Sequence, residues 1–181
     1  GIIYYCAINM CKRTLLLLTL FIYSFNVYSS QVVNIKNIGE QLEWITSNST
    51  LVEDKTQSLL GVDLNGNKIR DDIDEVMSQL VMSDAGEEFI TRYINYSFSI
   101  LDYDFSENRV ENIIFANSIY DEYRHFRHCY KESGVDGKDL YDTINIINKL
   151  IFNTDDRIVA YFNYEKYINI MSASDKVIYD C

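Results

Sequence analysis

An apolar repeat with helical spacing runs from residue 73 to residue 171 and predicts a helical fold. Its apolar residues recur every three to four positions, which places them on one face of an α-helix. Short polar or glycine-containing breaks divide the repeat into five predicted helices, at about 73–81, 87–104, 107–132, 138–152 and 155–171. The chain contains no proline, so no proline interrupts these helices.

Each predicted helix has its own set of apolar residues for a shared core. In chain order the sets are Ile73, Val76, Met77, Leu80 and Val81; Phe89, Tyr93, Tyr96 and Ile100; Val110, Ile113, Ile114, Tyr120, Tyr123, Phe126 and Tyr130; Leu140, Ile144, Ile147 and Ile151; and Ile158, Tyr161, Phe162, Ile168 and Met171. Breaks of a few residues favour antiparallel neighbours. We therefore predict an all-α domain, an antiparallel bundle or array of about five helices.

Residues 31–62 have the weakest periodicity of the chain. A short helix at 39–46, anchored by the single tryptophan Trp44, is the one element predicted there. The predicted organisation is a segment 1–30 that is removed, an irregular segment 31–62, and a helical domain 63–181 that a polar loop opens.

That loop, residues 63–74, carries oxygen-bearing side chains at the spacing of a cation site. Positions 1, 3, 5, 9 and 12 of the stretch are Asp63, Asn65, Asn67, Asp71 and Asp74. Position 7, Ile69, offers a backbone carbonyl while its side chain turns toward the core. Calcium accepts this mixture of carboxylate, amide and carbonyl oxygens. The spacing predicts a calcium site with these six residues as ligands.

The loop resembles the thrombospondin type 3 calcium repeats and EF-hand-like bacterial loops of the form D-x-N-x-N-G-[IV]-R-D-D-[IV]-[DE]. The resemblance covers twelve of 181 residues and implies calcium binding. It is weaker to a standard EF-hand or dockerin loop, in which the apolar residue falls one position later. Two residues depart from the usual pattern. Lys68 stands where a glycine makes the sharp turn, and Asp74 stands where a longer glutamate closes the shell.

A polar turn that caps a helix is the alternative interpretation of this stretch. Asn, Asp and Gly all favour turns, and the acids Asp71, Asp72 and Asp74 at a helix start are stabilised by the helix dipole. The sequence leaves both interpretations open.

The N-terminal region has the pattern of a secretory signal that begins at Met10. Lys12 and Arg13 precede an apolar run from Leu15 to Tyr23, and small residues at Ser29 and Ser30 follow. The run is short for a membrane span of about 20 apolar residues, so we expect cleavage near residue 30. Retention as a membrane anchor is the alternative. Export predicts a secreted or periplasmic protein with no membrane contact after cleavage.

Charge and cysteine content fit export. Loss of Lys12 and Arg13 leaves 14 basic residues against 27 acidic ones, which argues against nucleic acid and anionic membranes as partners. Two cysteines, Cys129 and Cys181, remain after cleavage, and in an oxidising compartment they have one possible pairing. We predict a disulfide between them, with two free thiols in a reducing compartment as the alternative.

The sequence contains no familiar catalytic motif. His125 and His128, with Asp121, Glu122 and Cys129 nearby, form either a transition-metal or catalytic patch or an exposed polar face among arginines. The predicted function is a non-enzymatic binding or envelope-associated protein with calcium and another protein as partners. The alternative is a secreted or periplasmic hydrolase whose acids meet only in the folded chain.

Overall fold

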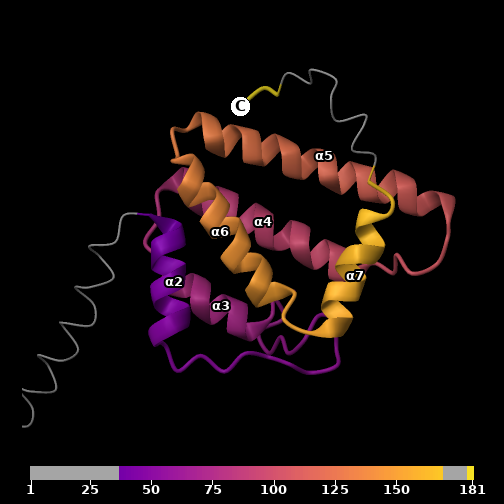
Figure 1. Cartoon of the computed structure of the whole chain (residues 1–181), viewed down its shortest axis with the longest axis horizontal. Helices are drawn as coiled ribbons and strands as arrows, with labels where there is room; N and C mark the ends of the chain where they lie inside the picture. Colours follow the sequence, from indigo (N-terminus) through magenta and orange to yellow (C-terminus); the bar gives the residue numbers. More distant parts are fainter. Residues whose placement is uncertain (1–36, 169–178) are drawn as a thin grey trace, which may run out of the picture. The chain divides into compact units, whose positions relative to one another are not determined.

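The protein is an array of α-helices (Figure 1). The computed structural model describes residues 37–168 and 179–181, and within them it has six α-helices and no β-strand. The helices are α2 (Ile38–Asn48), α3 (Asp71–Ser78), α4 (Asp84–Asp102), α5 (Val110–Glu132), α6 (Gly137–Ile151) and α7 (Asp155–Glu165). The predicted all-α class is confirmed. The predicted signal segment lies outside the described residues.

Two helix pairs organise the core. α2 packs against α6, and α4 packs against α5, while α7 contacts both members of the second pair. In Figure 1, α4 and α5 run side by side and α7 lies toward one end of them. A large apolar cluster joins α2, α3, α4, α6 and the C-terminal half of α5. A smaller one gathers Ile100, Phe105, Ala116 and Tyr164 beneath α7. None of the described helices combines the length and apolarity that crossing a bilayer requires.

Side chains cap three of the helix starts. Ser83, Asp136 and Thr154 accept hydrogen bonds from backbone N–H groups in the first turns of α4, α6 and α7. These groups have no partner within their own helix, so each cap contributes about 1 kcal/mol.

Residues 37–62 belong to the same compact unit as the later helices. α2 approaches α6 closely at Gly39, where an added Cβ would lie 2.9 Å from Asp142 Cβ. The buried Asp139 of α6 accepts from the N–H groups of Ile38 and Gly39, at 3.3 and 2.7 Å. A carboxylate from α6 therefore satisfies the first turn of α2, which has no side-chain cap of its own.

The helices differ from the predicted ones at several ends. α3 stops at Ser78 because the Gln41 amide holds Val81 through two hydrogen bonds, one to its N–H and one to its carbonyl, both 2.9 Å. Val81 is therefore 55% exposed and is not part of the predicted buried stripe. α7 ends at Glu165 and not near Met171, which lies outside the described residues.

Several apolar residues assigned to the core are on the surface. Ile113 and Ile114 of α5 are exposed, whereas Ala116 of the same helix packs into the smaller cluster. Ile158 and Phe162 of α7 are also exposed, while Tyr164 of the same helix is fully buried. The apolar stripe on both helices is wider than the surface that the neighbouring helices cover.

Candidate functional site

The loop 63–74 curls around the carboxylate of Asp63. One oxygen of Asp63 accepts from the N–H groups of Gly66 and Asn67 at 2.7 and 3.2 Å, and the other accepts from Lys68 at 2.8 Å. The two ends of the loop are joined by the hydrogen bond from Asp71 N–H to Val62 carbonyl, at 2.9 Å. A carboxylate at position 1 therefore fixes the whole turn.

Three of the predicted ligand side chains meet at one point. The amide nitrogens of Asn65 and Asn67 donate to the same oxygen of Asp74, at 2.9 and 2.7 Å. Asp71 instead accepts from the N–H of Leu64 at 3.1 and 3.3 Å. The structure thus joins positions 3, 5 and 12 directly and ties position 9 to the backbone of position 2.

The sharp turn of the loop falls at Lys68. Its φ is +70°, and Lys68 is the one non-glycine residue with positive φ among the described residues. This left-handed conformation costs an L-residue about 1–2 kcal/mol. Lysine therefore takes the backbone conformation that glycine supplies in the calcium loops that this stretch resembles. The neighbouring Ile69 packs its side chain against the core, as predicted.

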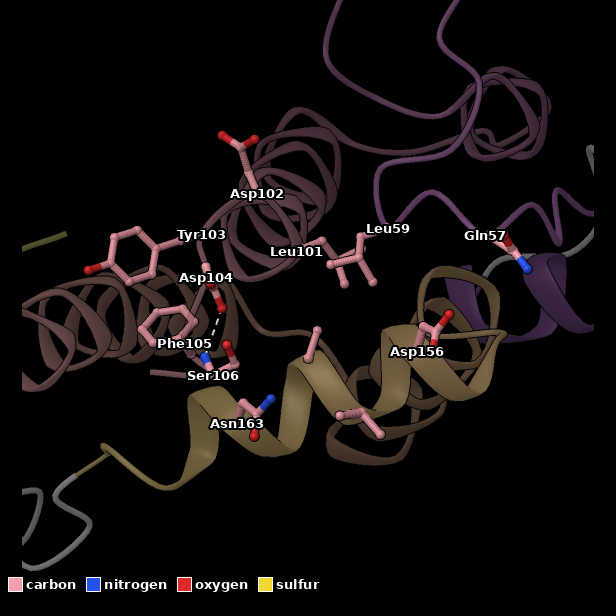
Figure 2. Close-up of a pocket in the computed structure, with 12 residues that line it drawn as sticks. Gln57, Leu59, Leu101, Asp102, Tyr103, Asp104, Phe105, Ser106, Asp156 and Asn163 are labelled. Carbon is pink, nitrogen blue, oxygen red and sulfur yellow. Dashed lines mark hydrogen bonds between the residues drawn. The ribbon is translucent and has the colours of Figure 1, made fainter. Parts of the chain in front are cut away.

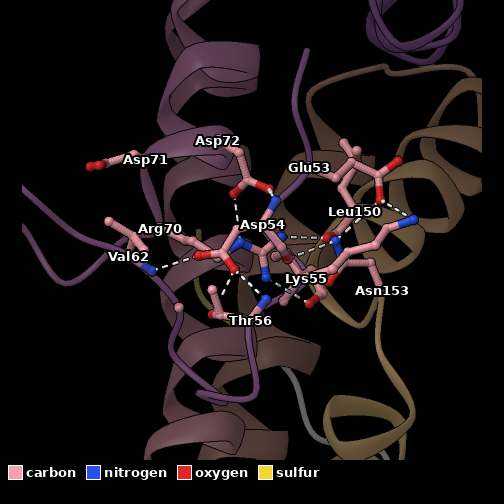
Figure 3. Close-up of polar contacts among 12 residues, drawn as sticks. Glu53, Asp54, Lys55, Thr56, Val62, Arg70, Asp71, Asp72, Leu150 and Asn153 are labelled. Carbon is pink, nitrogen blue, oxygen red and sulfur yellow. Dashed lines mark hydrogen bonds and ion pairs between the residues drawn. The ribbon is translucent and has the colours of Figure 1, made fainter.

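The next residue, Arg70, belongs to a buried polar network that the sequence analysis missed (Figure 3). Its side chain is fully buried and pairs with Asp72 at 2.5 Å. Its two terminal nitrogens donate to the carbonyls of Leu150 and Ile151 at the C-terminal end of α6, at 2.6 and 3.2 Å. Cations are favoured at that end of a helix, so Arg70 caps α6 from the 63–74 loop. Figure 3 shows Asp71 pointing away from this network.

A second buried arginine, Arg157 of α7, holds the irregular connection between α2 and α3. Its guanidinium donates to the backbone carbonyls of Asp54, Ser58 and Leu59, at 2.6, 2.8 and 3.0 Å. It also donates to the side chain of Asn153 at 2.5 Å. Burial, followed by the charge of Arg70, lowers the pKa of Arg157. The connection has little regular structure, but the buried Arg157 side chain holds its backbone in place.

Asp54 connects the two arginines. Its N–H donates to Asp72 at 2.8 Å, and its carboxylate lies 3.5 Å from the guanidinium of Arg157. Desolvation acts to raise the pKa of Asp54, but hydrogen bonds from Thr56 and Val62 and the charge of Arg157 outweigh it and hold the pKa at about 2. Asp54 is therefore an ionised carboxylate in this network.

Nothing in the residue pattern reveals this network. Arg70 and Arg157 lie 87 positions apart, and charged residues in loops are mostly solvated. The sequence pattern places Asp72 at the start of a helix. Its burial and its bond to Arg70 show a second role. In the structure, Gly61 allows the close approach of Arg70, because its φ is +75° and an added Cβ would lie 2.2 Å from Arg70 Cδ.

A cleft of about 370 Å³ lies between the C-terminal end of α4 and α7 (Figure 2). Its lining includes three acids, Asp102, Asp104 and Asp156, around an apolar floor. Hydrogen bonds from Ser106, together with the Arg109 charge, lower the pKa of Asp104 despite some desolvation. A general acid needs a raised pKa, so Asp104 does not fit that role.

The two histidines of α5 pack against the C-terminal residues. The ring of His125 stacks on Tyr179 at 5.2 Å, and its Nε2 lies 3.0 Å from the carbonyl of Asp180. The ring of His128 lies 5.5 Å from that of Tyr179. Both histidines are half-buried. They are therefore less accessible than the exposed polar face that was one of the two sequence interpretations.

Cys129 and Cys181 form the predicted disulfide, with Cα atoms 5.4 Å apart. It closes a loop of 52 residues, which contributes about 4 kcal/mol in the chain-entropy description. The sulfur atoms and a ring nitrogen of His125 lie within 4.8 Å of one another. Since both sulfurs are bonded to each other, they are not available as thiolate ligands. The structure thus favours a disulfide that attaches Cys181 to α5 over a transition-metal site at these residues.

No family model, curated protein or solved structure matches this chain.

Proposed function

We propose that this protein is exported and acts as a non-enzymatic binding or envelope-associated protein whose 63–74 loop holds one structural calcium ion. The observation that carries the proposal is the convergence of Asn65, Asn67 and Asp74 on one point, beside a turn organised by Asp63. The ion's remaining oxygens are assigned to Asp71 and the Ile69 carbonyl. A shell of this kind suits calcium, which takes six to eight oxygen ligands in flexible geometry.

The donor atoms fit a hard cation after a small rearrangement. The amides of Asn65 and Asn67 direct nitrogen toward Asp74. Each amide carries an oxygen and a nitrogen on the same carbon. A half-turn of the amide therefore presents oxygen instead, and it releases the N–H groups of Asn67 and Ile69 that now donate to the two amide oxygens. The left-handed turn at Lys68 is already formed. Calcium binding therefore requires side-chain rotation and leaves the loop backbone in place.

Calcium in this loop has a structural consequence because Arg70 follows the ligand Ile69 directly. Fixing the loop fixes the position from which Arg70 reaches the end of α6. Extracellular calcium sites bind in the range of about 10⁻⁴–10⁻³ M, which suits a stabilising ion outside the cell. The disulfide is consistent with an oxidising compartment.

The alternative function, a secreted or periplasmic hydrolase, has less support. Such an enzyme needs an acid whose pKa is raised into the working range. Within the part of the chain that the structure describes, the two acids with clearly shifted pKa values, Asp54 and Asp104, are both shifted downward. Their carboxylates serve turns and an ion pair, so no specific observation favours hydrolysis.

Thermal unfolding of the oxidised protein, titrated with calcium and separately with magnesium, tests the proposal. At calcium a hundredfold above its Kd, a site absent from the unfolded chain adds about 2.7 kcal/mol. For a domain of this size that raises Tm on the order of 10 °C. Magnesium demands stricter octahedral geometry and should have a much smaller effect.

Two variants separate the site from general charge effects. Asp63→Ala removes the carboxylate at position 1, so its Tm should not respond to calcium. Asp102→Ala removes an exposed acid outside the loop, so its response should equal that of the wild type. An unchanged wild-type Tm at millimolar calcium would reduce the stretch to a turn that opens α3.

A further inference from the structure

A cavity of about 270 Å³ lies where α4, α5, α6 and α7 meet. Its lining is mostly tyrosine: Tyr93 and Tyr96 from α4, Tyr120 and Tyr123 from α5, and Tyr161 from α7. The volume is close to the lower end of the range of ligand sites, about 300–1,000 Å³. The cavity therefore fits a small ligand that is surrounded by aromatic rings.

The rings form a connected and fixed wall. Tyr96 and Tyr123 stack with centroids 4.9 Å apart, and Tyr93 lies 5.8 and 5.7 Å from these two rings. The Tyr93 hydroxyl donates to Asn148 at 2.7 Å, and the Tyr96 hydroxyl lies 3.1 Å from that of Tyr164. Because these contacts hold the rings in place without a ligand, binding orders few side chains, which favours affinity.

The hydroxyl groups of this wall are neutral. Burial is the largest cause that raises the pKa of Tyr93, Tyr96, Tyr123 and Tyr161. Protonated tyrosines carry no charge, and their ring faces are electron-rich. A ligand in this cavity therefore meets a neutral and largely aromatic surface.

Glu165 is the one charged residue among the described residues that line the cavity. It lies one turn beyond Tyr161 on α7, accepts a hydrogen bond from the Tyr161 hydroxyl and is exposed. Its negative charge therefore acts on that hydroxyl and on a ligand that enters from solvent. The whole chain carries a net charge of −11, which adds a long-range attraction for cations. The positive charge of Arg127 on α5 lowers the pKa of Tyr93 and Tyr123. The same charge opposes the binding of a cation in the cavity.

We propose that this tyrosine cavity binds a small alkylammonium group. A sphere of 270 Å³ has a radius of about 4 Å, so a cation near its centre lies at about the 6 Å range over which ring faces attract cations. Glu165 supplies the counter-charge, and the methyl or methylene groups of the ligand replace water against the rings. Neutral aromatic walls with one carboxylate suit a weakly hydrated organic cation better than an inorganic one.

This inference goes beyond the proposed calcium function and uses no residue of the 63–74 loop. It assigns the protein a class of ligand, and the calcium experiments do not test it. The same ammonium chemistry occurs in free small molecules and in lipid headgroups, so the experiment includes both sources.

Calorimetric titration of the oxidised protein with choline, at low ionic strength, tests the proposal. The matched ligand is 3,3-dimethylbutan-1-ol, in which a carbon atom replaces the charged nitrogen at nearly the same shape. Choline should bind at least about tenfold more tightly than this alcohol, because only the cation is attracted by the rings and by Glu165. The ring signals of Tyr120 and Tyr123 in nuclear magnetic resonance spectra should shift with choline and saturate at the same Kd.

Two exposed charges provide opposite controls. Glu165→Gln should weaken choline binding about fivefold, and Arg127→Gln should tighten it about twofold, because each alters the field at the cavity by one charge. Tyr123→Phe retains the ring and should keep most of the affinity. Phosphatidylcholine vesicles identify the source: cosedimentation indicates a headgroup ligand, and its absence together with choline binding indicates a free ammonium compound.

Equal binding of choline and the alcohol, or no binding of choline at tens of millimolar, would overturn the proposal. So would choline binding that ignores both charge variants, because the cavity would then recognise shape alone. The titrations are repeated with and without calcium, so that the result for choline can be separated from the result for the calcium site.

Discussion

The 63–74 loop and the arginine network beside it share a stretch of chain but are held together differently. In the loop, Asp63, Asn65 and Asn67 bond to groups at most nine positions away, and the side chains of Asn65 and Asn67 are exposed. In the network, Arg70 and Arg157 are fully buried and bond to carbonyls about 80–103 positions away. The loop is a local structure, whereas the network exists only in the folded chain.

The difference predicts different sensitivities to mutation. An exposed polar group that loses its partner gains water in exchange, so its loss costs little. A buried carboxylate or carbonyl that loses an arginine remains without a partner and without water, which costs far more. Substitutions in the loop should therefore affect ion binding, and substitutions in the network should affect folding.

The largest contrast is expected between Arg70→Met and Asn65→Ala. Loss of Arg70 leaves Asp72 and the last carbonyls of α6 buried without their donor, so unfolding free energy should fall by about 3–5 kcal/mol. Asn65→Ala should change it by less than about 0.5 kcal/mol in the absence of calcium. Urea unfolding measures both, and similar losses in the two variants would contradict the contrast.

Two glycines with the same φ sharpen the comparison. Gly61 and Gly66 both have φ +75°, but an added Cβ at Gly61 meets Arg70 Cδ at 2.2 Å, whereas at Gly66 it meets nothing within 4 Å. Gly66→Ala should cost about 1–2 kcal/mol from the backbone alone. Gly61→Ala should cost about 1–3 kcal/mol more because of overpacking.

Urea unfolding gives the difference between the two glycine variants. The shared φ makes each the control of the other. Equal losses would show that the space around Arg70 adapts to the extra methyl group.

Acid should weaken the network through Asp54. Its pKa is about 2 in the folded chain against 3.8 for the free side chain, so the ionised form stabilises the fold fully above about pH 4 and less as pH falls toward 2. After allowance for solvent screening, the loss is about 1–2 kcal/mol. Between pH 5 and pH 2, the unfolding free energy should fall less steeply with decreasing pH for Asp54→Asn than for the wild type. Identical slopes would assign the acid sensitivity to other groups.

The smallest expected effect is a gain in the loop. Lys68→Gly removes the strain of a left-handed lysine at φ +70° and should raise stability by about 0.5–1 kcal/mol. Lys55→Gly is the control, because Lys55 lies in the α2–α3 connection without a positive φ. This variant should not raise the unfolding free energy. If the calcium proposal is right, Lys68→Gly should also bind calcium more tightly, which the same melts detect.

Much of the architecture was predictable because helices depend on neighbours in sequence. The apolar repeats predicted helices close to α4, α5 and α6. The disulfide was predictable because only two cysteines remain after the predicted signal. The exposure of Val81 was not, because it depends on Gln41, a side chain from another helix.

For the candidate site, the sequence alone determined which residues form the oxygen-rich loop, since their bonds join positions close together in the chain. It also determined the composition of the tyrosine-bearing helices. Only the tertiary structure decided that Arg70 turns inward, that Asp54 and Asp72 link it to Arg157, and that tyrosines of three helices line one cavity. Such groups meet only after the helices pack, and no local rule specifies which buried charges will become neighbours.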